Sequence, residues 1–370
     1  MMTTAGLEGI TATQSAVSSI IDGTLTYRGI DIDELADNAS FEEVVYLLWN
    51  GELPKAEALA RLKKDLVYYG VLPDEILSLL KSLPRNVHPM DTLRTVVSAL
   101  ALVDPETKDL SPEANRKKAL KIQAQMSTIV AAIQRVREGQ EILMPKSEYS
   151  FAQNFLYMLK GEEPDQVAVE AFNKALILHA DHELNASTFS ARVTVATLAD
   201  IYAGIVSAIG TLSGPLHGGA NEAVMGMLEE IGDVDNVEPY IRQALAEKRK
   251  IMGFGHRVYK TGDPRAKHLK EMSEKLTHLT GQRKLYEMSI KIDEIITREK
   301  GLLPNVDFYS ASVYQSLGIK RELFTPIFAV SRTSGWTAQI LEQYENNRLI
   351  RPRAEYIGPQ KRGYTPIEMR

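Results

Sequence analysis

The chain has 370 residues, of which 44% are hydrophobic and 25% are charged, values typical of globular proteins. This length allows two domains that each bury a core of their own. A net charge of −5 disfavours a nucleic-acid-binding protein, because phosphate neutralisation requires a sustained cationic surface. Because the sequence has no cysteine, disulfides, thiolate nucleophiles and metal centres with cysteine ligands are excluded.

Neither a membrane span nor an export signal is predicted. The apolar runs are shorter than the roughly 18 residues that a helix needs to span a bilayer. Residues 1–9 lack the cationic start and the apolar core of a signal peptide. We therefore expect a cytoplasmic protein without a membrane partner.

The elements in chain order begin with a weak strand signal over 10–27, where Ser, Thr and Val alternate. A helix is then expected after Ser40, which forms a capping-box pattern with Glu43, and it should stop near Asn50 and Gly51. Apolar residues at helical spacing predict five further helices, over 56–69, 74–80, 90–103, 114–138 and 148–160. The predicted fold class is all-α.

The segment 188–210 is rich in Ala, Gly, Ser and Val, and its charged residues are Arg192 and Asp200. Such a composition predicts one central helix that neighbours pack on all sides. No Gly/Ser-rich linker marks a domain boundary, so we expect boundaries at sharp turns, within 212–221 and 310–325. The segment between them would be a second domain inserted into the first.

Three of the seven histidines, His182, His217 and His256, lie in unusually constrained surroundings. Gly218 after His217 looks like a helix start, so the positive end of a helix dipole should favour a neutral imidazole at His217. A neutral imidazole can donate a hydrogen bond to a carbonyl oxygen on which negative charge develops. Alternatively, each of these histidines is only a turn residue.

A cationic segment surrounds His256. Residues 248–270 contain eight Lys and Arg residues and one acidic residue, Asp263. This segment is either a solvated helix face or a binding site for an anionic ligand. Nearby cations should lower the pKa of His256, and Arg265, expected in a loop after Asp263, suits a substrate carboxylate.

Two further residues lie in apolar surroundings. Asp307 lies between Val306 and Phe308, whose apolar surface should raise its pKa. Such a carboxylate can be a general base toward a carbon acid, or it can cap the following helix. Arg332 lies in an apolar stretch where an unpaired guanidinium is costly, so we expect an anionic partner.

A metal site is an alternative for His179 and His182, which stand three residues apart and precede Glu183. However, no third-ligand motif accompanies them, and His182 shares a helical stripe with Ala175 and Leu178. Core packing or substrate binding fits better, and we predict no metal.

Four segments together resemble the citrate synthase family over nearly the whole chain. They are GPLHGGAN at 214–221, GFGHRVY at 253–259, DPR at 263–265 and NVDFYS at 305–310, in family order. The resemblance implies a multihelical fold with a large domain, 1–217 and 321–370, that dimerises. It also implies a small mobile domain, 218–320, that binds CoA and closes on the substrate.

The resemblance implies a citrate synthase, an acyltransferase of the tricarboxylic acid cycle that needs no cofactor. In this reaction Asp307 takes a proton from acetyl-CoA, His217 stabilises the enol, and His256 polarises the carbonyl of oxaloacetate. The residues implied to bind oxaloacetate are His182, Asn185, Arg265, Arg332 and Arg351. Those implied to bind CoA are Lys260, Gly253, Phe254 and Gly255.

The resemblance implies that Arg351 reaches the oxaloacetate site from a second subunit, so a homodimer is expected. The nearest alternative is a 2-methylcitrate synthase, which uses propionyl-CoA, because one methylene changes binding by only about 1–3 kcal/mol. A more remote alternative is a noncatalytic scaffold that binds polyanions through residues 248–270.

Overall fold

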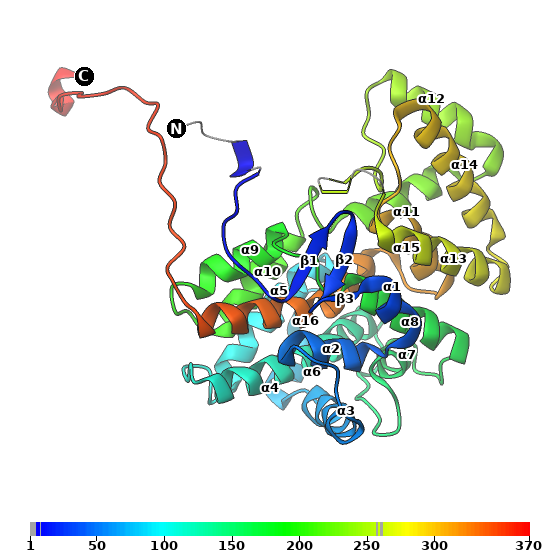
Figure 1. Cartoon of the computed structure of the whole chain (residues 1–370), viewed down its shortest axis with the longest axis horizontal. Helices are drawn as coiled ribbons and strands as arrows, with labels where there is room; N and C mark the ends of the chain where they lie inside the picture. The colour runs from blue at the N-terminus through cyan, green and yellow to red at the C-terminus, as the bar shows by residue number, and fades with distance from the viewer. Residues whose placement is uncertain (1–4, 8, 257, 260–261) are drawn as a thin grey trace.

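The computed structural model describes residues 5–7, 9–256, 258–259 and 262–370, and α-helices dominate this part of the chain (Figure 1). The α-helices are α1 (Ile32–Asn38), α2 (Phe41–Asn50), α3 (Ala56–Gly70), α4 (Asp74–Ser82), α5 (Pro89–Val103), α6 (Pro112–Arg137), α7 (Phe151–Lys160), α8 (Gln166–His179), α9 (Ala186–Val195), α10 (Ile201–Leu212), α11 (Ala220–Ile231), α12 (Val237–Ala246), α13 (Pro264–Leu279), α14 (Arg283–Lys300), α15 (Val306–Ser316) and α16 (Phe324–Glu345). The 3₁₀ helices are η1 (Ala5–Leu7), η2 (Val234–Asn236), η3 (Arg321–Leu323) and η4 (Ile367–Met369). The all-α prediction is confirmed.

The six helices expected between residues 40 and 160 are all present, with ends shifted by a few residues. At the start of α2, the backbone N–H of Ser40 donates to Glu43 Oε2 at 2.7 Å, and the Ser40 hydroxyl accepts from the backbone of Glu43. Gly51 ends α2 in a left-handed conformation, φ 83°. These helix ends follow from local capping, which is why the sequence predicted them.

The weak strand signal corresponds to an antiparallel hairpin, β1 (Ser18–Ile21) and β2 (Thr24–Tyr27). A third short strand, β3 (Ile30–Asp31), pairs with β2. The hairpin lies beside the helical body (Figure 1). Tyr27 is fully buried there.

The prediction of one helix over 188–210 is wrong. The segment forms α9 and α10, separated by a turn in which Leu198 has a positive φ of 65°. Asp200 then starts α10 by accepting the backbone N–H of Ala203 at 3.1 Å. A β-carbon at Gly204 would lie 2.7 Å from Val195, so the small residues serve close packing between two helices.

Helix α16 runs through the centre of the molecule and is buried over most of its length, contacting α2, α6, α8, α9 and α10. Helices α11 to α15 gather on one side of it (Figure 1). The chain enters this group after α10 and leaves it before α16, close to the boundaries expected at 212–221 and 310–325. The division into two domains stays a prediction.

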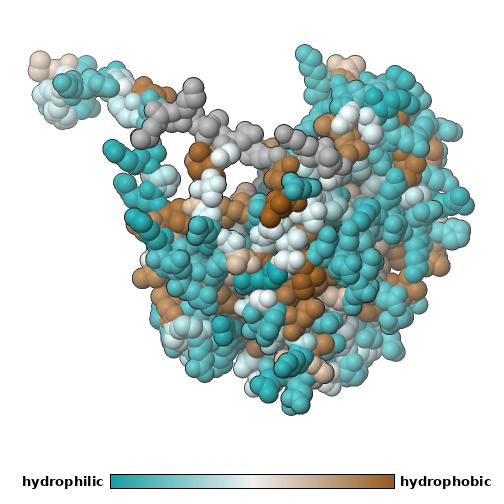
Figure 2. Space-filling model, in the orientation of Figure 1, coloured by the Kyte–Doolittle hydropathy of each residue, from teal (hydrophilic) through white to brown (hydrophobic). Residues whose placement is uncertain are grey.

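On the face drawn in Figure 2, the described residues are mainly hydrophilic, and hydrophobic side chains occur there in small groups. No described helix is both long enough and apolar enough to cross a membrane.

Candidate active site

A cleft of about 820 Å³ gathers residues from distant parts of the chain. The site residues predicted from the sequence that line it are His182, Asn185, His217, His256, Arg265, Asp307 and Arg332. They come from the turns after α8 and α10, from the segment before α13, from α16, and from the first turns of α13 and α15.

His217 lies two residues before Gly219, the N-cap of α11. Burial lowers its pKa to about 4, and the positive charge of Arg332 adds to this effect. The predicted neutral state is therefore supported, and burial is its main cause. The Nε2 atom lies 2.8 Å from the hydroxyl of Ser187, and Trp336 Nε1 donates to the same hydroxyl at 3.1 Å.

The tautomer of His256 follows from its backbone contacts. Its Nδ1 atom accepts the backbone N–H groups of Val258 at 3.0 Å and Tyr259 at 3.2 Å. Burial, reinforced by the charge of Arg265, lowers the pKa of His256. Because Nδ1 is an acceptor, the neutral ring carries its proton on Nε2, which leaves that N–H available as a donor.

Asp307 lies in the first turn of α15, but it does not cap that helix. Asn305 is the N-cap, and its side chain accepts the backbone N–H of Asp307 at 3.0 Å. Burial raises the pKa of Asp307 to about 7, while the charge of Arg265 opposes the shift. Its Oδ1 atom is buried and has no hydrogen-bond partner among the described residues. These properties are those of a general base that works near neutral pH.

Arg265 lies on α13, and its expected placement in a loop is wrong. Asp263 caps α13 and Pro264 is its first residue, a sequence pattern typical of helix starts. The guanidinium of Arg265 binds Asp263 through two hydrogen bonds, Nε to Oδ1 at 2.9 Å and Nη2 to Oδ2 at 2.7 Å. Although burial opposes ionisation, Arg265 holds the pKa of Asp263 below its usual range.

Arg332 is only 1% exposed. Its Nε donates to the carbonyl of His179 at 2.7 Å, and its guanidinium lies 4.7 Å from the ring centre of Phe328. No carboxylate in the described part of the chain forms an ion pair with it. Burial lowers its pKa to about 10, so it is still cationic at neutral pH. The anionic partner expected for Arg332 would therefore have to come from a bound ligand.

His182 and Asn185 lie in the turn between α8 and α9. Burial, with the charges of Arg265 and Arg332, lowers the pKa of His182 well below its ordinary value, and its Nε2 lies 3.1 Å from the Tyr259 hydroxyl. Asn185 is the N-cap of α9, since its Oδ1 accepts the backbone N–H of Thr188 at 3.1 Å. Asn185 therefore has a structural function besides its place in the cleft.

The premise of the alternative metal site does not hold. Helix α8 ends at His179, so His182 lies beyond the helix rather than on its face. His179 is fully buried with its Nδ1 at 2.7 Å from the carbonyl oxygen of Ala175, and burial lowers its pKa to about 3. Among the described residues, no group of three or more His, Asp or Glu side chains could hold a metal ion.

Of the residues predicted to bind CoA, the three that the structure describes, Gly253, Phe254 and Gly255, do not line the cleft. A β-carbon at Gly253 would lie 2.8 Å from Val224, and the ring of Phe254 packs 4.5 Å from that of Phe308. Gly255 donates its backbone N–H to Leu303 at 2.9 Å. This segment thereby fastens the His256 loop to the segment that precedes Asp307. Lys260 lies outside the described residues.

The described cations of the segment 248–270 do not form one exposed face. Acidic side chains contact several of its cations: Asp263 binds the buried Arg265, Asp33 binds Lys267, and Asp293 lies 3.3 Å from Lys270. This distribution disfavours the polyanion-binding scaffold, because that function requires a continuous cationic surface.

Sequence reasoning missed several residues at the site. Ser187 and Tyr259 contact His217 and His182 through hydroxyl groups, and residues of the N-terminal segment, such as Leu7 and Ile10, line the cleft. Tyr259 ends the motif at 253–259, but no local pattern predicts these contacts, because each one joins segments far apart in the sequence.

The family model for the citrate synthase C-terminal domain matches residues 6–353. The chain belongs to the citrate synthase family. It is an enzyme of the acyltransferase class, and the resemblance inferred from its motifs is confirmed.

Individual relatives agree with this assignment. The chain is 64% identical to citrate synthase 2 of Bacillus subtilis over the full length of both proteins. It is 43% identical to 2-methylcitrate synthase 2 of Corynebacterium glutamicum, over 99% of this chain and 97% of that one. The citrate synthase of Thermoplasma acidophilum, solved with carboxymethyl coenzyme A and oxaloacetate, is 36% identical with a TM-score of 0.94, covering 99% of this chain and 98% of that one.

Proposed function

We propose that the cleft condenses acetyl-CoA with oxaloacetate and water to give citrate and CoA, in the roles that follow. The observation that carries this proposal is Asp307, a buried carboxylate with a pKa of about 7 that shares one cleft with two neutral histidines, His217 and His256. The higher identity to the citrate synthase of Bacillus subtilis than to the 2-methylcitrate synthase supports acetyl-CoA as the acyl donor.

The first step is enolisation. Asp307 removes a proton from the methyl group of acetyl-CoA, and His217 donates a hydrogen bond to the thioester oxygen as it becomes negative. This role requires the His217 proton on Nδ1, so the Ser187 hydroxyl must donate to Nε2 rather than to Asn185 Oδ1, which also lies 2.8 Å from it. The 2.8 Å distance between the Ser187 hydroxyl and Nε2 suits that bond.

In the second step the enol carbon forms a bond with the carbonyl carbon of oxaloacetate. His256 donates a hydrogen bond from Nε2 to the carbonyl oxygen as the alkoxide forms, and the alkoxide becomes a hydroxyl with a proton that balances the one Asp307 removed from the methyl group. Water then cleaves the thioester of citryl-CoA, which releases citrate and the CoA thiol. The enolisation and the condensation use side chains of the protein, and the proposed sequence of steps needs no cofactor.

Cationic and neutral donors bind the oxaloacetate carboxylates. Arg332 lacks an ion-pair partner in the described chain, and Arg265 can use the guanidinium edge that Asp263 does not occupy. His182 and Asn185 complete the pocket. Residues 218–320, with Gly253, Phe254, Gly255 and Lys260, form the small domain that binds CoA and closes over the cleft.

Arg351 acts in the neighbouring subunit of a homodimer. It is exposed on a C-terminal tail that leaves the body after α16 and does not line the cleft of its own chain (Figure 1). The tail exposes large apolar side chains, including Tyr356 at 69% and Ile357 at 93%, which suit burial against a second subunit.

Mixing two impaired variants tests the dimer. Arg351→Ala should raise the KM for oxaloacetate about tenfold or more, because a guanidinium–carboxylate pair is lost. Mixed with Asp307→Asn under subunit exchange, it should regain activity, since each hybrid dimer then contains one complete site. Arg353→Ala, also on the tail, serves as the control. A fully active monomer, or mixing without recovery, would contradict the role of Arg351.

Ser187→Ala should lower kcat about tenfold, because His217 then loses the hydroxyl that orients its ring and fixes its tautomer. The KM for oxaloacetate should stay near the wild-type value. Ser190→Ala on the same helix is a matched control, because its hydroxyl bonds Ser207 instead. Steady-state kinetics would contradict the assignment if both variants behaved alike.

The proposed function is tested by the release of free CoA thiol with oxaloacetate and either acetyl-CoA or propionyl-CoA. A kcat/KM ratio that strongly favours acetyl-CoA is expected. A preference for propionyl-CoA would change the assignment to 2-methylcitrate synthase, and no release with either thioester would contradict both.

A further inference from the structure

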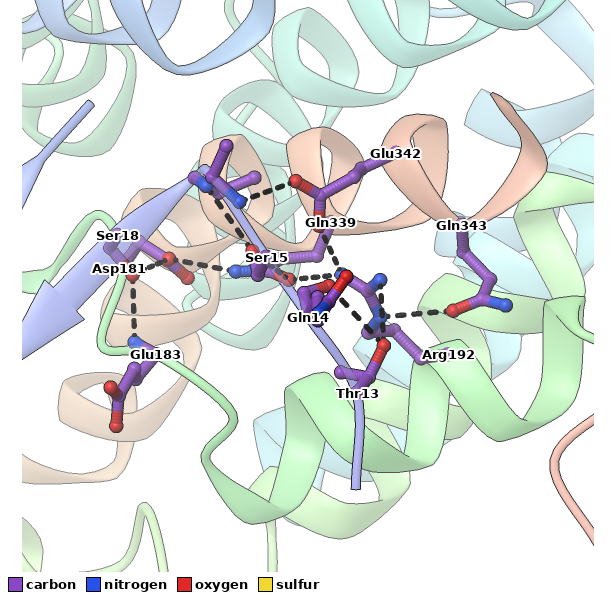
Figure 3. Close-up of polar contacts among 12 residues, drawn as sticks. Thr13, Gln14, Ser15, Ser18, Asp181, Glu183, Arg192, Gln339, Glu342 and Gln343 are labelled. Carbon is purple, nitrogen blue, oxygen red and sulfur yellow. Dashed lines mark hydrogen bonds and ion pairs between the residues drawn. The ribbon is translucent and has the colours of Figure 1, made fainter. Parts of the chain in front are cut away.

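One hydroxyl group holds the turn that carries His182 from both sides. Ser18, on β1, donates from Oγ to Asp181 Oδ2 at 2.5 Å and accepts the backbone N–H of Glu183 at 2.9 Å. Asp181 and Glu183 directly precede and follow His182 in the chain. Figure 3 shows Ser18 between these two residues.

The other strand of the hairpin contributes a second hydroxyl. Tyr27 accepts the backbone N–H of Asp181 at 3.2 Å, and its hydroxyl lies 3.0 Å from the carbonyl oxygen of Ile177 and 3.1 Å from that of Asp181. The turn also contains a strained residue, Glu183, with a φ of 51°. A non-glycine residue in the left-handed region requires such support from its surroundings.

Helix α16 fixes the Asp181 carboxylate from the opposite side. Gln339 donates from Nε2 to Asp181 Oδ2 at 3.2 Å, and its Oε1 accepts from Arg192 at 2.5 Å, which determines the orientation of the amide. Arg192 is itself paired with Glu342 at 2.7 Å (Figure 3). A β-carbon at Gly335 would lie 2.4 Å from Asp181 Oδ1, so the carboxylate has little freedom to move.

We infer that the hydroxyl groups of Ser18 and Tyr27 are positioning groups that hold His182 in the orientation needed to bind oxaloacetate. The inference rests on the proposed function. The hairpin and His182 both belong to the residues assigned to the large domain, and the hairpin holds the backbone on either side of His182. The imidazole ring of His182 contacts Tyr259 and His256, which belong to the proposed mobile segment. The hairpin therefore keeps His182 ready before the small domain closes, and this pre-organisation should appear in oxaloacetate affinity.

Ser18→Ala should raise the KM for oxaloacetate about tenfold, because Asp181 loses a bond and the N–H of Glu183 is left without its partner. The KM for acetyl-CoA should change less than about twofold. The matched control is Ser19→Ala on the same strand, whose hydroxyl bonds Thr26 at 2.8 Å and does not contact the turn. It should keep the wild-type KM for oxaloacetate. Tyr27→Phe should change the KM for oxaloacetate in the same direction as Ser18→Ala. It is tested instead if the Ser18→Ala variant does not fold.

A double-mutant cycle with His182→Ala separates positioning from a general loss of stability. If Ser18 acts through His182, adding Ser18→Ala to His182→Ala should change the KM less than about twofold. The inference would be overturned, with the proposed function left intact, if Ser18→Ala had an unchanged KM for oxaloacetate. It would also be overturned if Ser18→Ala raised this KM tenfold both in the wild-type protein and in the His182→Ala variant. A wild-type KM in His182→Ala would overturn the proposed role of His182 and the inference together.

Discussion

Replacing Asp307 with asparagine should lower kcat by about 10²- to 10⁴-fold, the usual contribution of a positioned general base. The substitution preserves shape but removes the proton acceptor, while Arg265, Arg332 and His256, which we assign to oxaloacetate, stay in place. The KM for oxaloacetate should therefore change little. Steady-state kinetics with both substrates would measure this separation of kcat from KM.

The wild-type pH profile gives an independent test of the same assignment. Because burial raises the pKa of Asp307 to about 7, the base is protonated below that pH, and kcat/KM should fall as the pH decreases through about 7. The residual activity of Asp307→Asn should lack this step. A comparable loss of oxaloacetate binding, or a pH step that persists in the variant, would contradict Asp307 as the base.

Replacing His256 with alanine should lower kcat/KM by about 10²- to 10⁴-fold and also raise the KM for oxaloacetate. In the proposed reaction the ring contacts oxaloacetate both in the bound state and in the transition state, so binding and catalysis should both suffer. Its Nδ1 also accepts two backbone N–H groups, which would lose their acceptor. Binding of oxaloacetate by calorimetry, together with steady-state kinetics, would separate the two effects.

His278→Ala is a suitable control for the His256 variant, because His278 is exposed in the last turn of α13. It should retain wild-type kinetics. If His256→Ala reduced the rate while oxaloacetate bound with unchanged affinity, His256 would not contact the substrate in the way proposed.

The local sequence determined the all-α class and most helix ends, because capping and helical periodicity act within a few residues. The capping box of Ser40 and Glu43 and the stop at Gly51 are examples. The motifs around His217, His256 and Asp307 also identified the family, and these three residues line one cleft.

Predictions failed where local signals were incomplete or where another local signal was overlooked. The segment 188–210 has the composition of one buried helix, but Asp200 starts a new one. Arg265 lies on a helix because Asp263 and Pro264 form a start signal that was read as a loop. The low pKa of His217 depends mainly on burial, which the local sequence around this residue did not reveal.

The sequence by itself determined which chemical groups are present and which local motifs contain them. Only the tertiary structure decided their protonation and orientation, because both depend on burial and on contacts between distant segments. Asp307 has a pKa of about 7 only once packing removes water from it. The hydroxyl of Ser18 supports the turn of His182 only because β1 packs against a turn 163 residues away along the chain.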